Sequence, residues 1–233
     1  DTKKIVDFNL CKRQEVSSVY IPNFDLLSQF PDHERFEVVD TIQLPVDTLT
    51  NQLKENNIHE IDFIKVDVQG YELPILQGGT EYLDNVIGIE VEVEFLELYK
   101  NQPLFNEVNS FLNKNNFELF DIKRYFWKKK QYKNNGASKG QLVFGDALYF
   151  KKPEQILLMQ NVNKDKIMRS IFVYLSYGYV DIAHELIIEA KNQGFIENSI
   201  KNELISFLST IDKDVCIPDF KGKNRIGLFF EKL

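Results

Sequence analysis

The chain has 233 residues, of which 43% are hydrophobic and 13% aromatic, so it can form one domain with a real core plus a smaller appendage. Its net charge of -7 argues against broad, salt-sensitive binding to nucleic acid, which needs an excess of lysine and arginine. No apolar run is long enough to span a bilayer, and no signal peptide pattern heads the chain. Cys11 and Cys216 match no metal-ligand spacing and predict free thiols in a reducing compartment. We therefore expect a cytoplasmic protein that binds neither nucleic acid nor membrane.

Predicted strands and helices alternate along the first part of the chain. Helices are expected to open near residues 47, 71 and 103, and the strands are expected at residues 4–10, 36–44, 61–68, 86–95, 117–126 and 141–150. This alternation is typical of an α/β fold with a mostly parallel sheet and helices on its faces. The last two strands are joined by a polar loop without a helix, so the final strand is expected to be antiparallel.

From Pro153 onward the pattern is helical only, with apolar residues such as Ile167, Ile171 and Tyr174 at helical spacing. We place a domain boundary near residue 152. Residues 1–152 then form the α/β domain and residues 153–233 an all-helical appendage. This tail would pack on the sheet domain or on a partner, and it offers a surface for self-association.

The apolar run from Ile61 to Val68 brings two charged residues to the end of a predicted buried strand. Lys65 and Asp67 share one side of this strand, because residues two apart face the same way. Ligands of open α/β sheets bind at such strand ends. Lys65 could stabilise an oxyanion or orient a hydroxyl group, or the two charges could form a structural ion pair. Gly70 suits the turn that follows, and Glu72 suits the first turn of a helix.

Three glutamates alternate with apolar residues in the next strand. Glu90, Glu92 and Glu94 therefore share one face, although the core of a parallel sheet does not hold three carboxylates. Either this side of the strand is exposed, or its end borders a cavity. Glu92 and Glu94 could then bind hydroxyls, act as a general base or hold a metal ion. The three histidines are scattered, so we expect no metal site.

Residues 123–133 mix lysine and arginine with aromatic side chains. This composition suits stacking of sugars or anionic acceptors, and it equally suits a solvated hairpin with its aromatic residues on the inner face. In an acidic chain both interpretations stay open.

Several segments in a fixed order resemble a known family. Residues 62–73 read DFIKVDVQGYEL, and Leu76-Gln77-Gly78-Gly79 follow them. This block resembles the central motif of the FkbM-type S-adenosylmethionine-dependent methyltransferases. Residues 92–95 (EVEF) and 145–149 (GDALY) resemble later blocks of the same family, and residues 17–18 (SS) resemble its hydroxyl-bearing loop. The resemblance covers about residues 1–152, and position 69 is often glutamate in the family whereas this chain has Gln69.

The resemblance implies a partial Rossmann-like methyltransferase sheet, S-adenosyl-L-methionine as cofactor, and methylation of a hydroxyl on a small-molecule or glycan acceptor. It implies catalytic roles for Lys65, Asp67 and Glu92, with Asp67 also next to the cofactor. Substrate-binding roles fall to Ser18 and Glu94. The family's glycine-rich turn after its first strand is not found here. We therefore expect a fragment, the C-terminal portion of the domain, which lacks the N-terminal cofactor-binding part. The alternative is a non-catalytic binding or assembly module built on a truncated methyltransferase fold.

Overall fold

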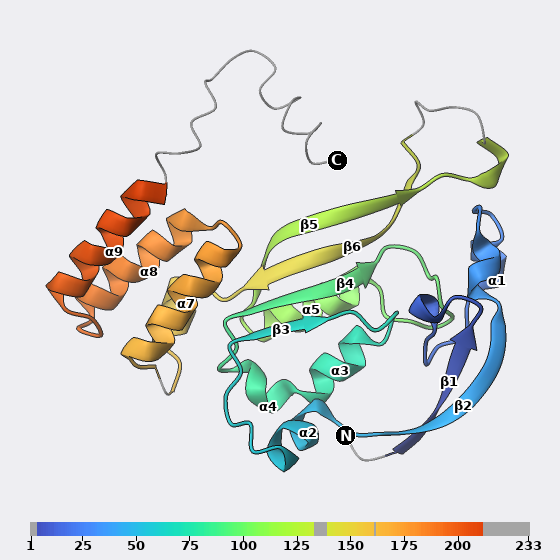
Figure 1. The fold of residues 1–233 in the computed structure, drawn as a ribbon, viewed down its shortest axis with the longest axis horizontal. Coiled ribbons are helices and arrows are strands. Elements are labelled where there is room, and N and C mark those ends of the chain that lie inside the picture. The colour runs from blue at the N-terminus through green and yellow to red at the C-terminus, as the bar shows by residue number, and fades with distance from the viewer. Residues whose placement is uncertain (1–3, 133–138, 161, 212–233) are drawn as a thin grey trace. The chain divides into compact units, whose positions relative to one another are not determined.

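The computed structural model describes residues 4–132, 139–160 and 162–211 (Figure 1). The chain divides into two compact units, Asp1–Val162 and Asn163–Leu233, which are described separately. In chain order the elements are β1 (Lys4–Cys11), η1 (Gln14–Val16), α1 (Phe24–Leu27), η2 (His33–Phe36), β2 (Val38–Val46), α2 (Leu49–Glu55), β3 (Phe63–Val66), α3 (Glu72–Gly78), α4 (Thr80–Leu83), β4 (Gly88–Glu94), α5 (Phe105–Lys114), β5 (Glu118–Trp127), η3 (Lys130–Tyr132), β6 (Gln141–Phe150), α6 (Pro153–Leu157), α7 (Lys164–Ser176), α8 (Val180–Asn192) and α9 (Asn198–Ile211). The predicted mixed α/β class is confirmed.

The main sheet of the first unit has four strands in the order β3-β4-β6-β5 (Figure 1). Strands β3 and β4 pair in parallel, with Lys65 opposite Glu90. Strand β6 lies between β4 and β5 and is antiparallel to both. Three strands thus run in one direction and the final strand runs in the other, as the loop without a helix predicted.

The strands β1 and β2 correct one expectation. They form a separate two-stranded antiparallel sheet, in which Lys4 lies opposite Val46, and they are not part of the main sheet. The sequence analysis placed both strands in the parallel sheet. Their alternating pattern of half-buried and exposed residues explains the difference, because a parallel strand needs apolar side chains on both faces whereas an antiparallel pair can leave one face in water.

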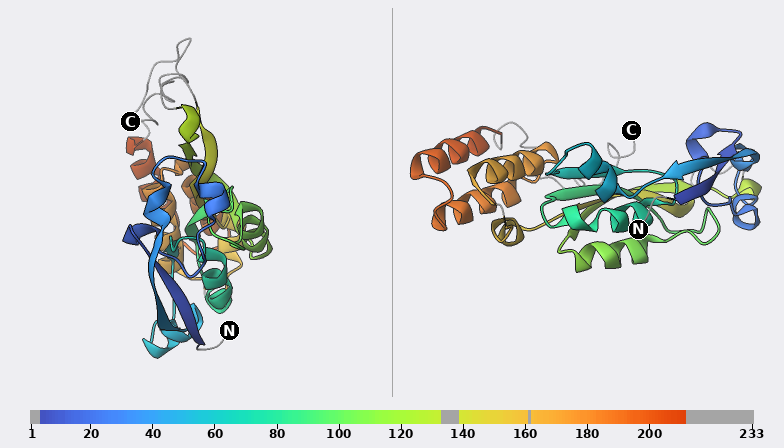
Figure 2. Two further views of the ribbon diagram at one scale, coloured as in Figure 1. Left: turned by 90° about the vertical axis from the view of Figure 1, so that its right-hand side faces the viewer. Right: turned by 90° about the horizontal axis from the view of Figure 1, so that it is seen from below.

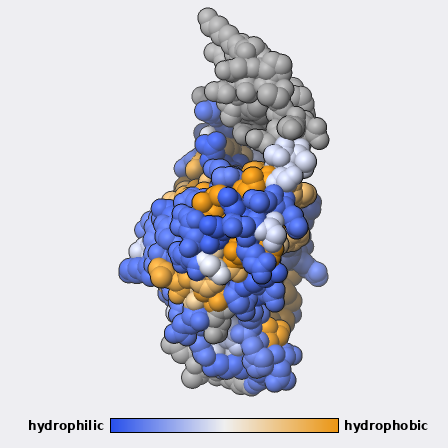
Figure 3. Space-filling model, turned by 90° about the vertical axis from the view of Figure 1, so that its left-hand side faces the viewer, coloured by the Kyte–Doolittle hydropathy of each residue, from blue (hydrophilic) through white to orange (hydrophobic). Residues whose placement is uncertain are grey.

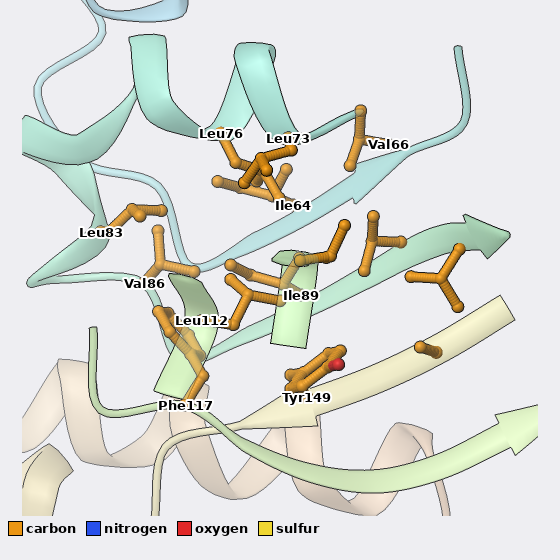
Figure 4. Packing of buried hydrophobic residues seen from close by; sticks show 14 residues of the cluster. Ile64, Val66, Leu73, Leu76, Leu83, Val86, Ile89, Leu112, Phe117 and Tyr149 are labelled. Atoms are coloured by element: carbon orange, nitrogen blue, oxygen red, sulfur yellow. The ribbon is translucent and has the colours of Figure 1, made fainter. Parts of the chain in front are cut away.

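The core of the first unit lies between the sheet and the helices α3 and α5, which cover one face (Figure 2). Figure 4 shows Ile64 and Val66 of β3 and Ile89 of β4 pointing toward Leu73 and Leu76 of α3. Because side chains alternate along a strand, the polar residues between these apolar positions point to the opposite face. This alternation puts the charged side chains of β3 and β4 on the face away from α3.

The second unit contains the helices α7, α8 and α9. Asn163 begins α7 by accepting a hydrogen bond from the backbone N–H of Lys166 at 2.9 Å. The apolar positions expected inside, Ile167, Ile171 and Tyr174, are buried. The outer surface of this unit is mostly hydrophilic with hydrophobic patches between (Figure 3). The predicted boundary near residue 152 and the role of the tail stay predictions.

Two further expectations concern cysteine and the membrane. Cys11 is a buried free thiol, whereas Cys216 lies outside the described residues. Within the described ranges, every helix is too short or too polar to cross a bilayer.

Candidate functional site

The turn after β3 has an unusual backbone that one carboxylate holds in place. Gln69 and Gly70 are both in the left-handed region, with φ of 58° and 95°. Glu72 is 2% exposed, and its Oε1 atom accepts the backbone N–H groups of Val68 at 2.8 Å and Gly70 at 3.2 Å. Burial raises the pKa of Glu72 despite these donors. Glu72 therefore stabilises the turn after β3 through these two hydrogen bonds, in addition to its position in the first turn of α3.

The side chain of Gln69 joins three segments of the first unit. Its Nε2 atom donates to Oδ1 of Asp67 at 3.1 Å and to Oε2 of Glu92 at 3.0 Å. Its Oε1 atom accepts a hydrogen bond from the hydroxyl of Tyr99 at 3.1 Å. The turn after β3, the strand β4 and the segment after β4 are thus connected by one amide group.

Acidic side chains gather around this amide. Oxygen atoms of Asp67, Glu72 and Glu92 lie within 4.8 Å of one another. Burial, followed by the charges of Asp67 and Glu72, raises the pKa of Glu92 to about 9. Burial also raises the pKa of Glu94, with further contributions from Glu72 and Glu92. At neutral pH the group therefore carries fewer negative charges than it has carboxyls.

A pocket of about 450 Å³ opens above these carboxylates at the ends of β3 and β4. We call it the acidic–aromatic pocket. It is lined by Glu15, Asp67, Glu92 and Glu94, by Phe36, Trp127 and Phe144, and by Val16, Arg35, Gln69 and Leu98. Its walls combine hydrogen-bond acceptors with apolar rings, which is the usual composition of a small-molecule site.

Arg35 is the one cation that lines this pocket within the described part of the chain. Its Cζ atom lies 5.0 Å from the ring centroids of both Phe36 and Trp127. It reaches Asp32 at 3.8 Å, on the solvent side, and its Nε atom is buried without a hydrogen-bond partner. Arg35 thus contacts two rings of the aromatic wall, which we define as Phe36, Trp127 and Phe144. It forms no ion pair with the carboxyls of the floor, which we define as Asp67, Glu92 and Glu94.

The predicted site residues are distributed unequally around the pocket. Asp67, Glu92 and Glu94 line it, as the cavity interpretation of their strand predicted. Lys65 does not line it, because its ammonium group forms an ion pair with Glu90 on the exposed face of the sheet. Ser18 is fully buried. The catalytic and binding roles of all five residues stay predictions.

The hydroxyl of Ser18 is used inside the protein. It donates to the backbone carbonyl of Gln69 at 2.7 Å and accepts the backbone N–H of Tyr20 at 3.0 Å. Ser18 therefore connects its loop to the turn that presents Gln69. Its geometry fits a positioning role better than direct contact with a substrate.

The aromatic wall of the pocket could not be predicted from the sequence. Phe36 precedes β2, Trp127 ends β5 and Phe144 lies in β6, so no local spacing relates these residues. The available signal was the mixture of cations and aromatics at residues 123–133, which contains Trp127; of this stretch, residue 133 lies outside the described residues. The inner-face interpretation applies to Trp127, which packs against Phe30, Phe36 and Phe144.

Part of the chain that forms the pocket matches a known family. Residues 14–119 match the family model described as methyltransferase FkbM domain. The predicted resemblance is confirmed for this segment. The FkbM segment contains Asp67, Glu92 and Glu94, whereas Trp127 and Phe144 follow it in the chain. No curated protein and no solved structure matches the chain significantly.

Proposed function

We propose that this protein takes part in transfer of a methyl group from S-adenosyl-L-methionine to a hydroxyl oxygen of a small-molecule or glycan acceptor, on a Rossmann-like sheet. The observation that carries the proposal is the position of Asp67, Glu92 and Glu94. These residues lie inside the segment that matches the FkbM methyltransferase domain, and they line one pocket. The pocket opens where two neighbouring parallel strands end, which is where α/β sheets bind ligands.

The cofactor would supply an electrophilic methyl group on a positively charged sulfonium. Asp67 is an exposed carboxylate directly after β3, and no lysine or arginine of the described chain forms an ion pair with it. Its negative charge complements a sulfonium, so this residue fits the cofactor-side role that the sequence analysis gave it. Lys65 would act on Asp67 only through its charge, since its ammonium is paired with Glu90.

Asp67 and Glu92 would handle the proton of the acceptor hydroxyl. The two side chains are close enough to interact, and the raised pKa of Glu92 means that this carboxyl holds a proton near neutral pH. Asp67 can then accept a hydroxyl proton, while Glu94 orients the acceptor from the same pocket. The amide of Gln69 fixes the positions of Asp67 and Glu92, and such alignment would provide a large part of the rate enhancement.

The test is transfer of a labelled methyl group from S-adenosyl-L-methionine to a panel of sugars and other hydroxyl compounds. Asp67→Ala should abolish transfer while the thermal unfolding midpoint stays close to that of the wild type, because Asp67 is exposed. Glu81→Gln, a change of an exposed residue in α4, provides the control for removal of one charge. Wild-type turnover by Asp67→Ala would contradict the proposal.

One observation favours a second function of another class, a non-catalytic binding or assembly module. Strand β3 is at the edge of the main sheet and pairs only with β4 among the described strands. The free edge of a strand can pair with another segment or chain. Calorimetry with S-adenosyl-L-methionine separates the two functions, because the module predicts no binding and the methyltransferase predicts a saturable isotherm.

A further inference from the structure

The floor of the acidic–aromatic pocket lacks a countercharge. Glu94 is 3% exposed, and Glu92 is half-buried beside Asp67 and Glu72. No lysine or arginine of the described ranges forms an ion pair with any of these four carboxyls. Lys65 is turned to Glu90 outside the pocket. Carboxyls buried without a partner hold their protons, and a ligand that brings positive charge would favour their ionised form.

The wall of the same pocket offers the surface that an organic cation uses. The ring centroids of Phe36 and Trp127 are 6.2 Å apart, and those of Trp127 and Phe144 are 6.1 Å apart, so the three rings are adjacent. The guanidinium of Arg35 already lies 5.0 Å from two of these rings. The protein's own cation thus shows that the ring faces attract positive charge.

We propose that the acidic–aromatic pocket binds a small organic cation, with the positive charge near Glu92 and Glu94 and the alkyl part against Trp127 and Phe36. Under the proposed function the cation would be an ammonium group of the acceptor. The proposal depends on that function only for the identity of the ligand. Binding of a cation can be measured without methyl transfer.

The arrangement favours an organic cation over a bare metal ion. The Nε2 atom of Gln69 already donates to both Asp67 and Glu92, at the place where a shared metal ion would need free oxygen atoms. The Oε1 atom of Glu72 accepts two backbone N–H groups. A pocket of about 450 Å³ with three aromatic rings also has room for alkyl groups.

The test compares two compounds of the same shape, choline and 3,3-dimethyl-1-butanol, which differ in one positive charge. Trp127 is the only tryptophan of the chain and lies in the pocket wall, so its fluorescence reports binding at this site. Choline should bind at least about tenfold more tightly than the neutral alcohol, because it gains both carboxylate and ring contacts. Equal affinity for the two compounds would overturn the proposal.

Variants locate the charge that matters. Glu92→Gln keeps the shape of the side chain and should weaken choline binding about tenfold at pH 9.5, above the pKa of about 9 at which the wild-type carboxyl ionises. Glu90→Gln removes the same charge from the same face of β4 outside the pocket, and should leave the affinity within about twofold. Arg35→Met removes the cation that covers the rings and should tighten binding. Equal losses in Glu92→Gln and Glu90→Gln would show a long-range charge effect only and would overturn the proposal.

Two further titrations separate the sources of the cation. Stronger quenching by S-adenosyl-L-methionine than by S-adenosylhomocysteine, with choline inert, would show binding of the methyl donor only and would overturn the proposal. A fluorescence change with Mg²⁺ alone, with both organic cations inert, would overturn it. Charge selectivity in a protein without methyl transfer would leave the cation site standing and reject the proposed function. Methyl transfer without charge selectivity would support the proposed function and reject the cation site.

Discussion

The side-chain nitrogen of Gln69 lies 3.0 Å from Oε2 of Glu92, and this hydrogen bond connects the turn after β3 to the strand β4. The same nitrogen reaches Asp67 at 3.1 Å. An amide donor between two carboxylates reduces their repulsion without adding a charge. The position that differs from the usual glutamate of the FkbM family is therefore at the centre of the site.

Replacing this amide by a carboxylate tests its role. Gln69→Glu places a third carboxyl against Asp67 and Glu92 and removes both donated hydrogen bonds. The free energy of unfolding should fall by about 1–3 kcal/mol, and the loss should grow with pH as more of the carboxyls ionise. Urea unfolding at pH 6 and pH 9 measures this change. A loss of the same size at both pH values would show that charge repulsion is not its cause.

The protonation of Glu92 makes stability depend on pH. The pKa of its carboxyl rises from 4.5 to about 9 in the folded protein, through burial and the charges of Asp67, Glu72 and Asp146. The folded state therefore binds this proton more tightly, and the contribution is complete below pH 4.5 and is lost as the pH rises toward 9. Each pKa unit corresponds to about 1.4 kcal/mol, so several kcal/mol is the upper limit.

Glu92→Gln removes this dependence. Relative to the wild type, its free energy of unfolding should increase steadily between pH 5 and pH 9, as measured by urea unfolding. Glu154→Gln, at an exposed position of α6, provides the control for loss of one charge. Parallel pH profiles of the wild type and Glu92→Gln would contradict a raised pKa of this carboxyl.

The sequence predicted the main sheet better than its surroundings. Period-two and near-continuous apolar patterns located the strands of the main sheet within about three residues, because burial against α3 and α5 produces these patterns. They could not show that β1 and β2 leave the main sheet, nor that β6 lies between β4 and β5. Strand order depends on contacts far apart in the chain, and local patterns do not contain it.

The candidate site could be predicted in part for a similar reason. Asp67, Glu92 and Glu94 were found because a charge at the end of an apolar strand is visible in the sequence. The sequence pointed to the hydroxyl of Ser18, but only the structure shows that this hydroxyl donates a hydrogen bond to the backbone carbonyl of Gln69. Trp127 lies at the end of β5 and lines the pocket. Its position depends on the strand order β3-β4-β6-β5, which local sequence patterns do not contain.

A matched pair of substitutions tests Glu72 as the residue that holds the turn. Glu72→Gln keeps the oxygen that accepts the N–H groups of Val68 and Gly70, whereas Glu72→Leu removes it. Glu72→Leu should lower the free energy of unfolding by about 2–4 kcal/mol, since the half-buried N–H of Val68 and the buried N–H of Gly70 lose their acceptor. Glu72→Gln should cost much less in the same denaturation experiment. Similar losses in both variants would assign the effect to the charge of Glu72.

The last prediction concerns the backbone of the same turn. Gly70 has φ of 95°, and a Cβ atom there would lie 3.4 Å from side-chain atoms of Gln102 and Tyr99. Gly70→Ala should lower the free energy of unfolding by about 1–3 kcal/mol through backbone strain, because the contact distance itself is ordinary. Gly178→Ala provides the control, because its φ of 83° imposes similar strain away from the pocket. Gly70→Ala should also weaken the response of Trp127 fluorescence to choline, because the turn positions Gln69 beneath the pocket; an unchanged response would show that the site tolerates movement of this turn.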